Sequence, residues 1–148
     1  MPTIEEVINE LRTLEDIEFG TGVDEPGIRD VEARLGVSIP PEYRVFLREF
    51  GYLAIDDLEV FGSGHDVPRH LDVVNVAERE RFVLQPDLPL NLIPLSNDGA
   101  GNYYVLRTDV TDAPVAFWDH ELGRSQVPEP VAGSFSEWLQ REVAARRG

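Results

Sequence analysis

The fold is decided by the stretch VEARLGVSIPPEYRVFLREFGYLAIDDLEVFG, which runs from Val31 to Gly62. Gly36 and Gly51 predict the ends of two helices, because glycine adopts the left-handed conformation without a Cβ clash. Pro41 predicts the first turn of the second helix, where its missing N–H has no intrahelical partner. Apolar side chains recur along this second helix at helical spacing, and they predict one buried stripe formed by Tyr43, Phe46, Leu47 and Phe50. Two extended segments then predict a hairpin, Tyr52–Ile55 and Leu58–Phe61.

Helices are also predicted at both ends of the chain. Thr3 with Glu6, and Ser134 with Glu137, have the spacing of capping boxes, in which side chains satisfy unpaired backbone N–H groups. Asp24 is a suitable N-cap for a further helix that ends at Gly36. These sequences therefore place helices before and after the segments that carry strand patterns.

A further helix is predicted over Leu71–Leu84, after an irregular loop at Gly62–Pro68. One side of this helix carries Leu71, Val74, Ala77 and Arg81. The run Glu78-Arg79-Glu80-Arg81 alternates in charge, which is typical of a solvent-exposed helix surface.

The second half of the chain contains strand patterns at Leu92–Leu95, Asn102–Thr108 and Val115–Asp119. Turn-forming residues separate them at Ser96–Gly101 and at Asp109–Asp112, so the last two strands are expected to pair as a hairpin. Helices come first, strands follow and a helix closes the chain, an order that predicts one α+β domain over residues 1–148.

The composition is strongly acidic, with 28 Asp and Glu against 13 Lys and Arg and a formal net charge of −15. Such a charge repels nucleic acid and anionic membranes, whereas it attracts a basic protein partner. Solubility, or an acidic host proteome, would explain the same charge. The chain has no cysteine, which excludes a disulfide scaffold, a thiol nucleophile and a cysteine-ligated zinc site.

The N-terminus, Met1-Pro2-Thr3, leads directly into an acidic amphipathic pattern. A basic segment followed by an apolar segment, which would indicate a secretory signal, is not seen, nor is an apolar stretch of membrane-spanning length. We therefore expect a cytoplasmic protein.

The segment most similar to an enzyme site is Asp119-His120-Glu121, with His65 and His70 elsewhere in the chain. Histidine and carboxylates can bind a metal or transfer protons, but adjacent residues of an extended segment point to alternate faces. Neither H-E-x-x-H nor G-x-S-x-G is present. We expect no catalytic site, no metal and no cofactor; a metal-dependent hydrolase remains the alternative. Asp98–Gly101 is interpreted as a turn and not as a calcium loop, which needs more regularly spaced oxygens.

Several blocks occur in a fixed order along almost the whole chain. They are Leu35-Gly36…Ile39-Pro40-Pro41-Glu42-Tyr43…Phe46-Leu47…Gly51, Ile93-Pro94-Leu95, Asp98–Tyr104, Phe117-Trp118-Asp119-His120-Glu121 and Ser134–Leu139. This ordered set resembles the SUKH superfamily. The resemblance implies an α+β fold in which helices pack on one face of a mostly antiparallel sheet. It also implies a non-enzymatic bacterial immunity protein that binds and occludes a cognate polymorphic toxin domain, often a nuclease or a deaminase. Some similar domains are regulatory scaffolds, including in cell-wall signalling, and that is the second interpretation.

The predicted partner surface combines carboxylates, which would enter a basic toxin groove, with aromatic anchors that exclude water. Alternation along the strands requires that one of Tyr103 and Tyr104, and one of Phe117 and Trp118, faces the uncovered side of the sheet. Which sheet face is open is not decided by the sequence. The hypothesis places the partner-binding site on Asp56, Asp57, Glu59, Tyr103, Trp118, Asp119 and Glu121.

Overall fold

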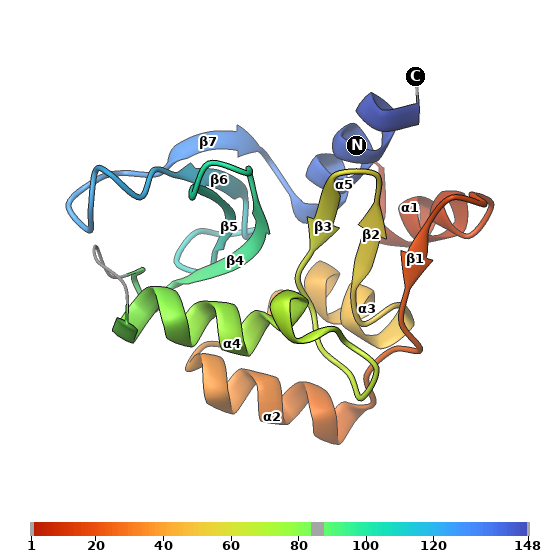
Figure 1. The fold of residues 1–148 in the computed structure, drawn as a ribbon, viewed down its shortest axis with the longest axis horizontal. Helices are drawn as coiled ribbons and strands as arrows, with labels where there is room; N and C mark the ends of the chain where they lie inside the picture. The colour runs from red at the N-terminus through yellow and green to blue at the C-terminus, as the bar shows by residue number, and fades with distance from the viewer. Residues whose placement is uncertain (1, 84–87, 148) are drawn as a thin grey trace.

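The computed structural model describes residues 2–83 and 88–147, and it confirms the α+β class (Figure 1). Its α-helices are α1 (Ile4–Leu11), α2 (Glu25–Leu35), α3 (Pro41–Glu49), α4 (Val73–Glu78) and α5 (Phe135–Arg147). A short 3-10 helix, η1 (Arg69–Leu71), precedes α4, and a π-helix, η2 (Arg79–Val83), follows it. The strands are β1 (Glu18–Phe19), β2 (Leu53–Ile55), β3 (Leu58–Val60), β4 (Leu92–Asn97), β5 (Tyr103–Arg107), β6 (Val115–Trp118) and β7 (Glu129–Ala132).

The strands form two antiparallel sheets, with the orders β1-β2-β3 and β4-β5-β6-β7. The sheets meet where the Phe61 N–H donates to the Leu95 carbonyl oxygen at 2.8 Å. Helices α1, α3 and α5 gather beside the first sheet, whereas α4 packs on β4 and on α2 (Figure 1). The expected hairpins are present, and β1 and β7 are additional strands that the sequence patterns did not indicate.

Helix α3 lies in the centre of the core. Its predicted stripe is fully buried, since Tyr43, Phe46, Leu47 and Phe50 are all 0% exposed. The rings of Tyr43 and Phe46 pack edge-on against Phe135 of α5. The Tyr43 hydroxyl donates to the Phe61 carbonyl oxygen at 2.6 Å, which attaches the helix to the end of β3. Burial of this stripe thus joins the N-terminal helices, the first sheet and the C-terminal helix.

The C-terminal end of α3 is a place where three backbone segments meet without room for a Cβ atom. A Cβ on Gly62 would lie 1.5 Å from the Gly51 carbonyl oxygen, and one on Gly22 would lie 2.1 Å from the Arg48 carbonyl oxygen. Gly51 itself has φ 78°, a conformation that L side chains rarely adopt. The Ser63 N–H donates to the Gly51 carbonyl oxygen at 2.9 Å across this contact.

The predicted caps are present. Oxygens of Thr3 and Asp24 accept from the backbone N–H groups of Glu6 and Gly27, at 3.1 and 3.0 Å. The Ser134 hydroxyl accepts from the Glu137 N–H at 3.2 Å at the start of α5. Local side-chain hydrogen bonds therefore define these helix starts as the sequence indicated.

The predicted helix over Leu71–Leu84 is corrected in two respects. It is divided into η1, α4 and η2, and residue 84 lies outside the described residues. Only the first half of the charged run is a solvated surface: Glu78 and Arg79 are exposed, whereas Glu80 is 7% exposed and Arg81 only 4%. Arg81 donates to the carbonyl oxygens of Leu35 at 2.6 Å and of Leu90 at 3.0 Å. The guanidinium thus satisfies carbonyls at the C-terminal end of α2 and before β4, where the helix dipole favours a cation.

Glu32 fixes the turn between α2 and α3. Its carboxylate accepts from the Ile39 N–H at 2.8 Å and from the Arg44 guanidinium. The hydrogen bond from Ile39 is the main cause that lowers the pKa of Glu32 below its ordinary value of 4.5; Arg44 adds to it, against the opposing effect of burial. This carboxylate is thus stabilised in its ionised form by both sides of the turn.

Substitution at Gly62 is expected to be far more destabilising than substitution at Gly36. Gly62→Ala places a methyl group onto the Gly51 carbonyl, so we expect a loss of roughly 4 kcal/mol or more in unfolding free energy. Gly36→Ala meets no atom within 4 Å and carries only the cost of φ 78°, about 1–2 kcal/mol. Urea unfolding of both variants measures the difference, and equal losses would contradict the close approach.

Glu32→Gln tests the turn through its pH dependence. Because the pKa of Glu32 is lowered on folding, its stabilising effect is fully present above pH 4.5 and is lost as pH falls through the lowered value. The deficit of Glu32→Gln in unfolding free energy should therefore be largest at neutral pH and shrink as the pH falls below 4.5. Asp30→Asn, on an exposed face of the same helix, is the control. A Glu32→Gln deficit that did not change with pH would refute this role.

Candidate protein-binding surface

The tip of the β2–β3 hairpin carries three of the predicted residues. Asp56 and Asp57 form its two-residue turn, with Asp56 at φ 51°, and Ile55 pairs with Leu58 to close it. Asp56, Asp57 and Glu59 are exposed, whereas Leu58 is buried. The alternation along β3 therefore directs the Glu59 carboxylate outward while its apolar neighbours enter the core.

Further carboxylates surround this hairpin. Glu18 of β1, Ala54 of β2 and Glu59 of β3 lie opposite one another across the sheet and so share one face. Glu15 and Asp16, in the connection before β1, line a hollow together with Asp56. These residues form what we call the acidic hairpin surface, which comprises the exposed residues Glu15, Asp16, Glu18, Asp56, Asp57 and Glu59.

Few cations balance the acidic hairpin surface. Arg146 of α5 donates through Nε to the Asp57 carboxylate at 2.7 Å, and this pair lowers the pKa of Asp57. His70 Nε2 lies 3.1 Å from the Glu59 carboxylate. In residues 2–83 and 88–147, Arg146 and His70 are the basic side chains within ion-pair distance of the six carboxylates, and Arg146 carries a permanent positive charge. The surface therefore keeps a large excess of negative charge.

A cleft of about 410 Å³ opens beside the hairpin. It brings Asp57 and Glu59 together with Asp98 of the β4–β5 turn and with Glu142 of α5. The Tyr103 hydroxyl lies in this cleft and accepts from Arg79 Nη2 at 3.4 Å. The predicted residues Asp57, Glu59 and Tyr103 are thus brought to one place.

The two predicted aromatic anchors are buried, which corrects the sequence hypothesis. Tyr103 is 3% exposed and Trp118 only 1%, and the two pair directly across β5 and β6. They lie on the sheet face where Tyr103 meets Phe61, and burial raises the pKa of Tyr103. Tyr104 and Phe117, on the opposite face, are the half-buried pair, with ring centroids 5.6 Å apart. Alternation places the two pairs on opposite faces, and the packing of the two sheets leaves this pair the more accessible one.

Asp119 and Glu121 do not line the cleft. The Asp119 carboxylate accepts from the Glu121 N–H at 2.9 Å within the loop that follows β6. His120 Nδ1 lies 2.6 Å from the Asn102 side-chain oxygen, which ties this loop to the β4–β5 turn. The segment Asp119-His120-Glu121 therefore makes local hydrogen bonds. In the described parts of the chain, no three His, Asp or Glu side chains converge as metal ligands.

The β4–β5 turn is held by its own side chain. Asp98 accepts from the Ala100 N–H at 2.8 Å and from the Asn102 N–H at 3.0 Å. Burial opposes ionisation of Asp98, but the hydrogen bond from the Asn102 side chain, together with these two backbone hydrogen bonds, lowers its pKa. The geometry is that of a turn whose carboxylate is already satisfied by backbone donors, as the interpretation of this segment expected.

The sequence reasoning missed five carboxylates of this region and the cation Arg146. The acidic run around Glu15, Asp16 and Glu18 was visible in the sequence, but nothing local indicated that β1 pairs with β2. The pairing of Arg146 with Asp57 spans 89 residues of chain, so no spacing rule reveals it. Asp98 and Glu142 join the site only because the two sheets and α5 meet there.

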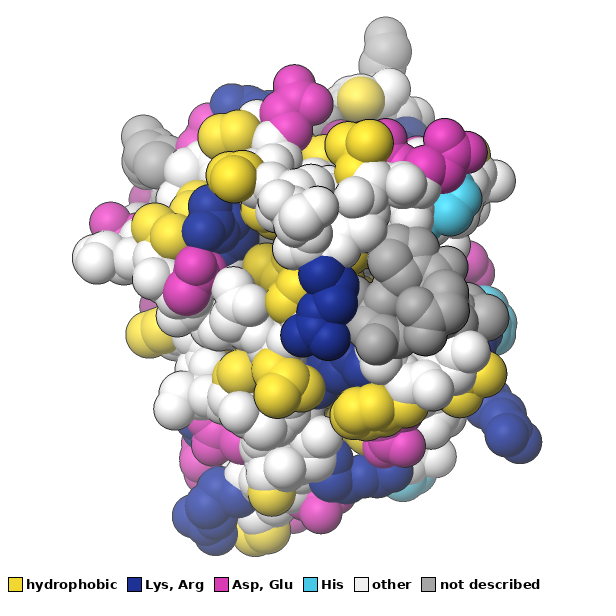
Figure 2. All heavy atoms as spheres, turned by 90° about the vertical axis from the view of Figure 1, so that its left-hand side faces the viewer, with side chains coloured by type: hydrophobic (Ala, Val, Ile, Leu, Met, Phe, Trp, Pro, Cys, Tyr) yellow, Lys and Arg dark blue, Asp and Glu magenta, His cyan; other side chains and the backbone are white. Residues whose placement is uncertain are grey.

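The opposite end of the molecule presents arginine and hydrophobic side chains. Figure 2 views the side of the four-stranded sheet and shows Arg side chains in its centre among hydrophobic ones. A hollow of about 270 Å³ there is lined by Arg107, Arg124 and Val127, and Val127 is 81% exposed. Arginine side chains thus face this side, whereas the acidic hairpin surface lies at the first sheet. Among the described helices, none is both long and apolar enough to cross a membrane.

Comparison with known proteins gives a family for the whole fold. The family model described as "SUKH_5: SMI1-KNR4 cell-wall" matches residues 4–144. A solved structure of a protein from Pseudomonas syringae pv. tomato superposes with a TM-score of 0.67 and 24% sequence identity. The alignment covers 92% of this chain and 95% of that chain, and it shows a common fold. No curated protein matches. Because the family model covers nearly the entire sequence, the chain belongs to the SUKH superfamily, in the SMI1-KNR4 cell-wall family.

Proposed function

We propose that this chain is a non-enzymatic immunity protein, which binds a basic toxin domain through the acidic hairpin surface and occludes its active groove. The observation that carries the proposal is the set of six exposed carboxylates with only Arg146 and His70 as ion-pair partners in the described chain. Membership in the SUKH superfamily is consistent with such a role. The toxin would be a nuclease or a deaminase, and the complex would form in the cytoplasm of the producing cell.

The proposed mechanism is electrostatic occlusion. A groove that binds nucleic-acid phosphates carries Arg and Lys side chains, and the carboxylates of the hairpin would occupy the positions of those phosphates. The excess negative charge accelerates encounter with such a groove and fixes its orientation. Because Leu58 and Val60 anchor β3 in the core, the carboxylates are presented on a rigid strand, which limits the entropy lost on binding.

The aromatic part of the proposed interface is revised to Tyr104. This side chain lines the same cleft as Asp57 and Glu59, and it is half-buried where Tyr103 is buried. An aromatic ring at the edge of a charged patch can exclude water from neighbouring ion pairs and so strengthen them. Phe117 packs against Tyr104 and supports its orientation.

A second candidate function is a regulatory scaffold, and the cell-wall description of the matching family favours it. The same acidic surface would then hold a basic segment of a regulatory partner instead of a toxin groove. Both candidates need protein binding and no chemistry, so the identity of the partner distinguishes them.

Neutralising the hairpin tests the proposal directly. The triple variant Asp56→Asn, Asp57→Asn, Glu59→Gln should slow association with any toxin-like domain encoded by a neighbouring gene by about tenfold or more at low salt. Asparagine tolerates the positive φ at position 56, so the turn should be retained. Stopped-flow or surface plasmon resonance kinetics at low and moderate salt give the rates, and the effect should diminish as salt screens the charges.

The control removes the same number of charges elsewhere, at the exposed residues Asp30, Glu121 and Glu129. Asp30→Asn, Glu121→Gln, Glu129→Gln should change association only slightly. Equal rates for both triple variants would reject the acidic hairpin surface as the binding site. Tight binding of a regulatory protein, with none to the neighbouring toxin-like domain, would favour the scaffold function.

A further inference from the structure

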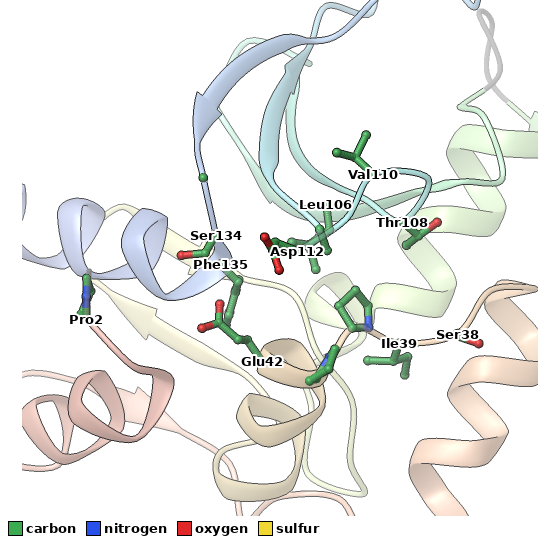
Figure 3. Close-up of a pocket in the computed structure, with 14 residues that line it drawn as sticks. Pro2, Ser38, Ile39, Glu42, Leu106, Thr108, Val110, Asp112, Ser134 and Phe135 are labelled. Atoms are coloured by element: carbon green, nitrogen blue, oxygen red, sulfur yellow. The ribbon is translucent and has the colours of Figure 1, made fainter.

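A cavity of about 550 Å³ lies on another part of the molecule, between the N-terminal ends of α3 and α5 and the β5–β6 connection (Figure 3). Its apolar lining includes Ile39, Leu106 and Phe135, which are at most 4% exposed, together with Pro40 and Pro41. Cavities of this size with an apolar lining and a few polar groups are typical of ligand sites. None of its lining residues belongs to the acidic hairpin surface.

Two carboxylates are the charged groups of the described lining, Glu42 from α3 and Asp112 from the β5–β6 connection. Figure 3 shows them on different walls of the cavity. Glu42 accepts from the Ser136 N–H at 3.1 Å and from the Ser136 hydroxyl at 2.8 Å, one bond to each oxygen. A carboxylate has about four acceptor positions, so Glu42 can accept further hydrogen bonds.

Asp112 is held at the cavity in an unusual conformation. It is exposed, and within residues 2–83 and 88–147 its carboxylate has no hydrogen-bonding or ion-pair partner. Asp112 and Ala113 have φ angles of 69° and 44°, which residues other than glycine seldom adopt. Strained backbone of this kind often positions groups for ligands, and here it places an unpaired carboxylate beside an apolar cavity.

The net charge of the groups around the cavity indicates which charge a bound group should carry. The N-terminal ends of α3 and α5 each carry about half a positive charge, since the peptide dipoles of a helix add up. The two carboxylate charges and these two positive half-charges add up to about one negative charge. An anion is therefore disfavoured, and a neutral group would leave the negative charge of the cavity unpaired. A group with one positive charge and an apolar body would both neutralise this charge and pack against the apolar lining.

We propose that this cavity binds the side chain of an arginine presented by a protein partner. Its aliphatic stem packs on Pro40, Pro41 and Val110, the accessible apolar side chains of the lining, and its guanidinium lies between Asp112 and Glu42. A guanidinium suits carboxylates on separate walls because it directs five N–H donors within one plane. It is also less strongly hydrated than an ammonium group, so entry into an apolar cavity costs less. This site is distinct from the acidic hairpin surface, and it does not depend on the proposed immunity function.

The test uses small probes and the full-length chain. Acetyl-arginine-N-methylamide, titrated against ¹⁵N-labelled protein, should shift the amide resonances around Ile39, Asp112 and Phe135. Acetyl-citrulline-N-methylamide has nearly the same shape without the charge, and it should bind about tenfold more weakly. Free arginine has the same net charge, because its α-ammonium and α-carboxylate groups cancel, so a cavity that recognises the side chain should bind it no more tightly than the peptide-like probe. Tighter binding of free arginine would reject a partner's side chain as the occupant.

Asp112→Asn is the decisive variant. Asparagine keeps the size and accepts a positive φ, and Asp112 has no partner in the described chain whose loss would disturb the fold. Affinity for the arginine probe should fall about tenfold, while affinity for the citrulline probe should not change. Glu121→Gln removes the same charge from an exposed loop and should leave both affinities unchanged. Equal binding of the two probes, an unchanged affinity in Asp112→Asn, or shifts confined to the hairpin would each overturn the proposal.

Discussion

The structure depends on the close contact of three backbone segments at the C-terminal end of α3. Gly22, Gly51 and Gly62 approach so closely there that a single methyl group would overlap a carbonyl oxygen. The contact fixes the β2–β3 hairpin and the β1 connection against the same helix end. Because the hairpin carries the acidic surface, the orientation of the candidate site follows from backbone packing and not from the charged residues themselves.

Charge and core are combined in the same short strand. Along β3, Leu58 and Val60 enter the core while Glu59 faces outward, so the hairpin can present carboxylates on a rigid base. Like charges on one surface repel one another and oppose folding. The burial of α3, with four fully buried apolar side chains in and just beyond the helix, provides the compensating stability. A protein partner with a basic surface would relieve the repulsion, which is consistent with the proposed function.

The segment Ile39-Pro40-Pro41-Glu42 has two roles in this fold. It begins α3, and it also lines the cavity between α3 and α5, where Glu42 accepts from the backbone and side chain of Ser136. One carboxylate thereby joins two helix starts that are 94 residues apart. The cavity and the acidic hairpin surface lie on different elements, so the chain can contact a partner at two separate places.

The sequence by itself determined the local structure. Interactions between residues close in sequence form the caps at Thr3, Asp24 and Ser134, the apolar stripe of α3 and the hairpins. Such interactions can be predicted from the spacing of residue types. The SUKH resemblance was likewise recognisable from ordered blocks, and it gave the fold class.

The tertiary structure alone decided which groups are accessible. Alternation shows that Tyr103 and Tyr104 point to opposite faces of the second sheet. Only the packing of Phe61, which follows β3 of the first sheet, against Tyr103 decides that Tyr103 is the buried one. A charged run indicated a solvated helix, yet Arg81 is buried because carbonyls from α2 and from the segment before β4 surround it. The pairing of Arg146 with Asp57 also joins distant parts of the chain. In each case the environment comes from residues far away in sequence, so no local pattern contains it.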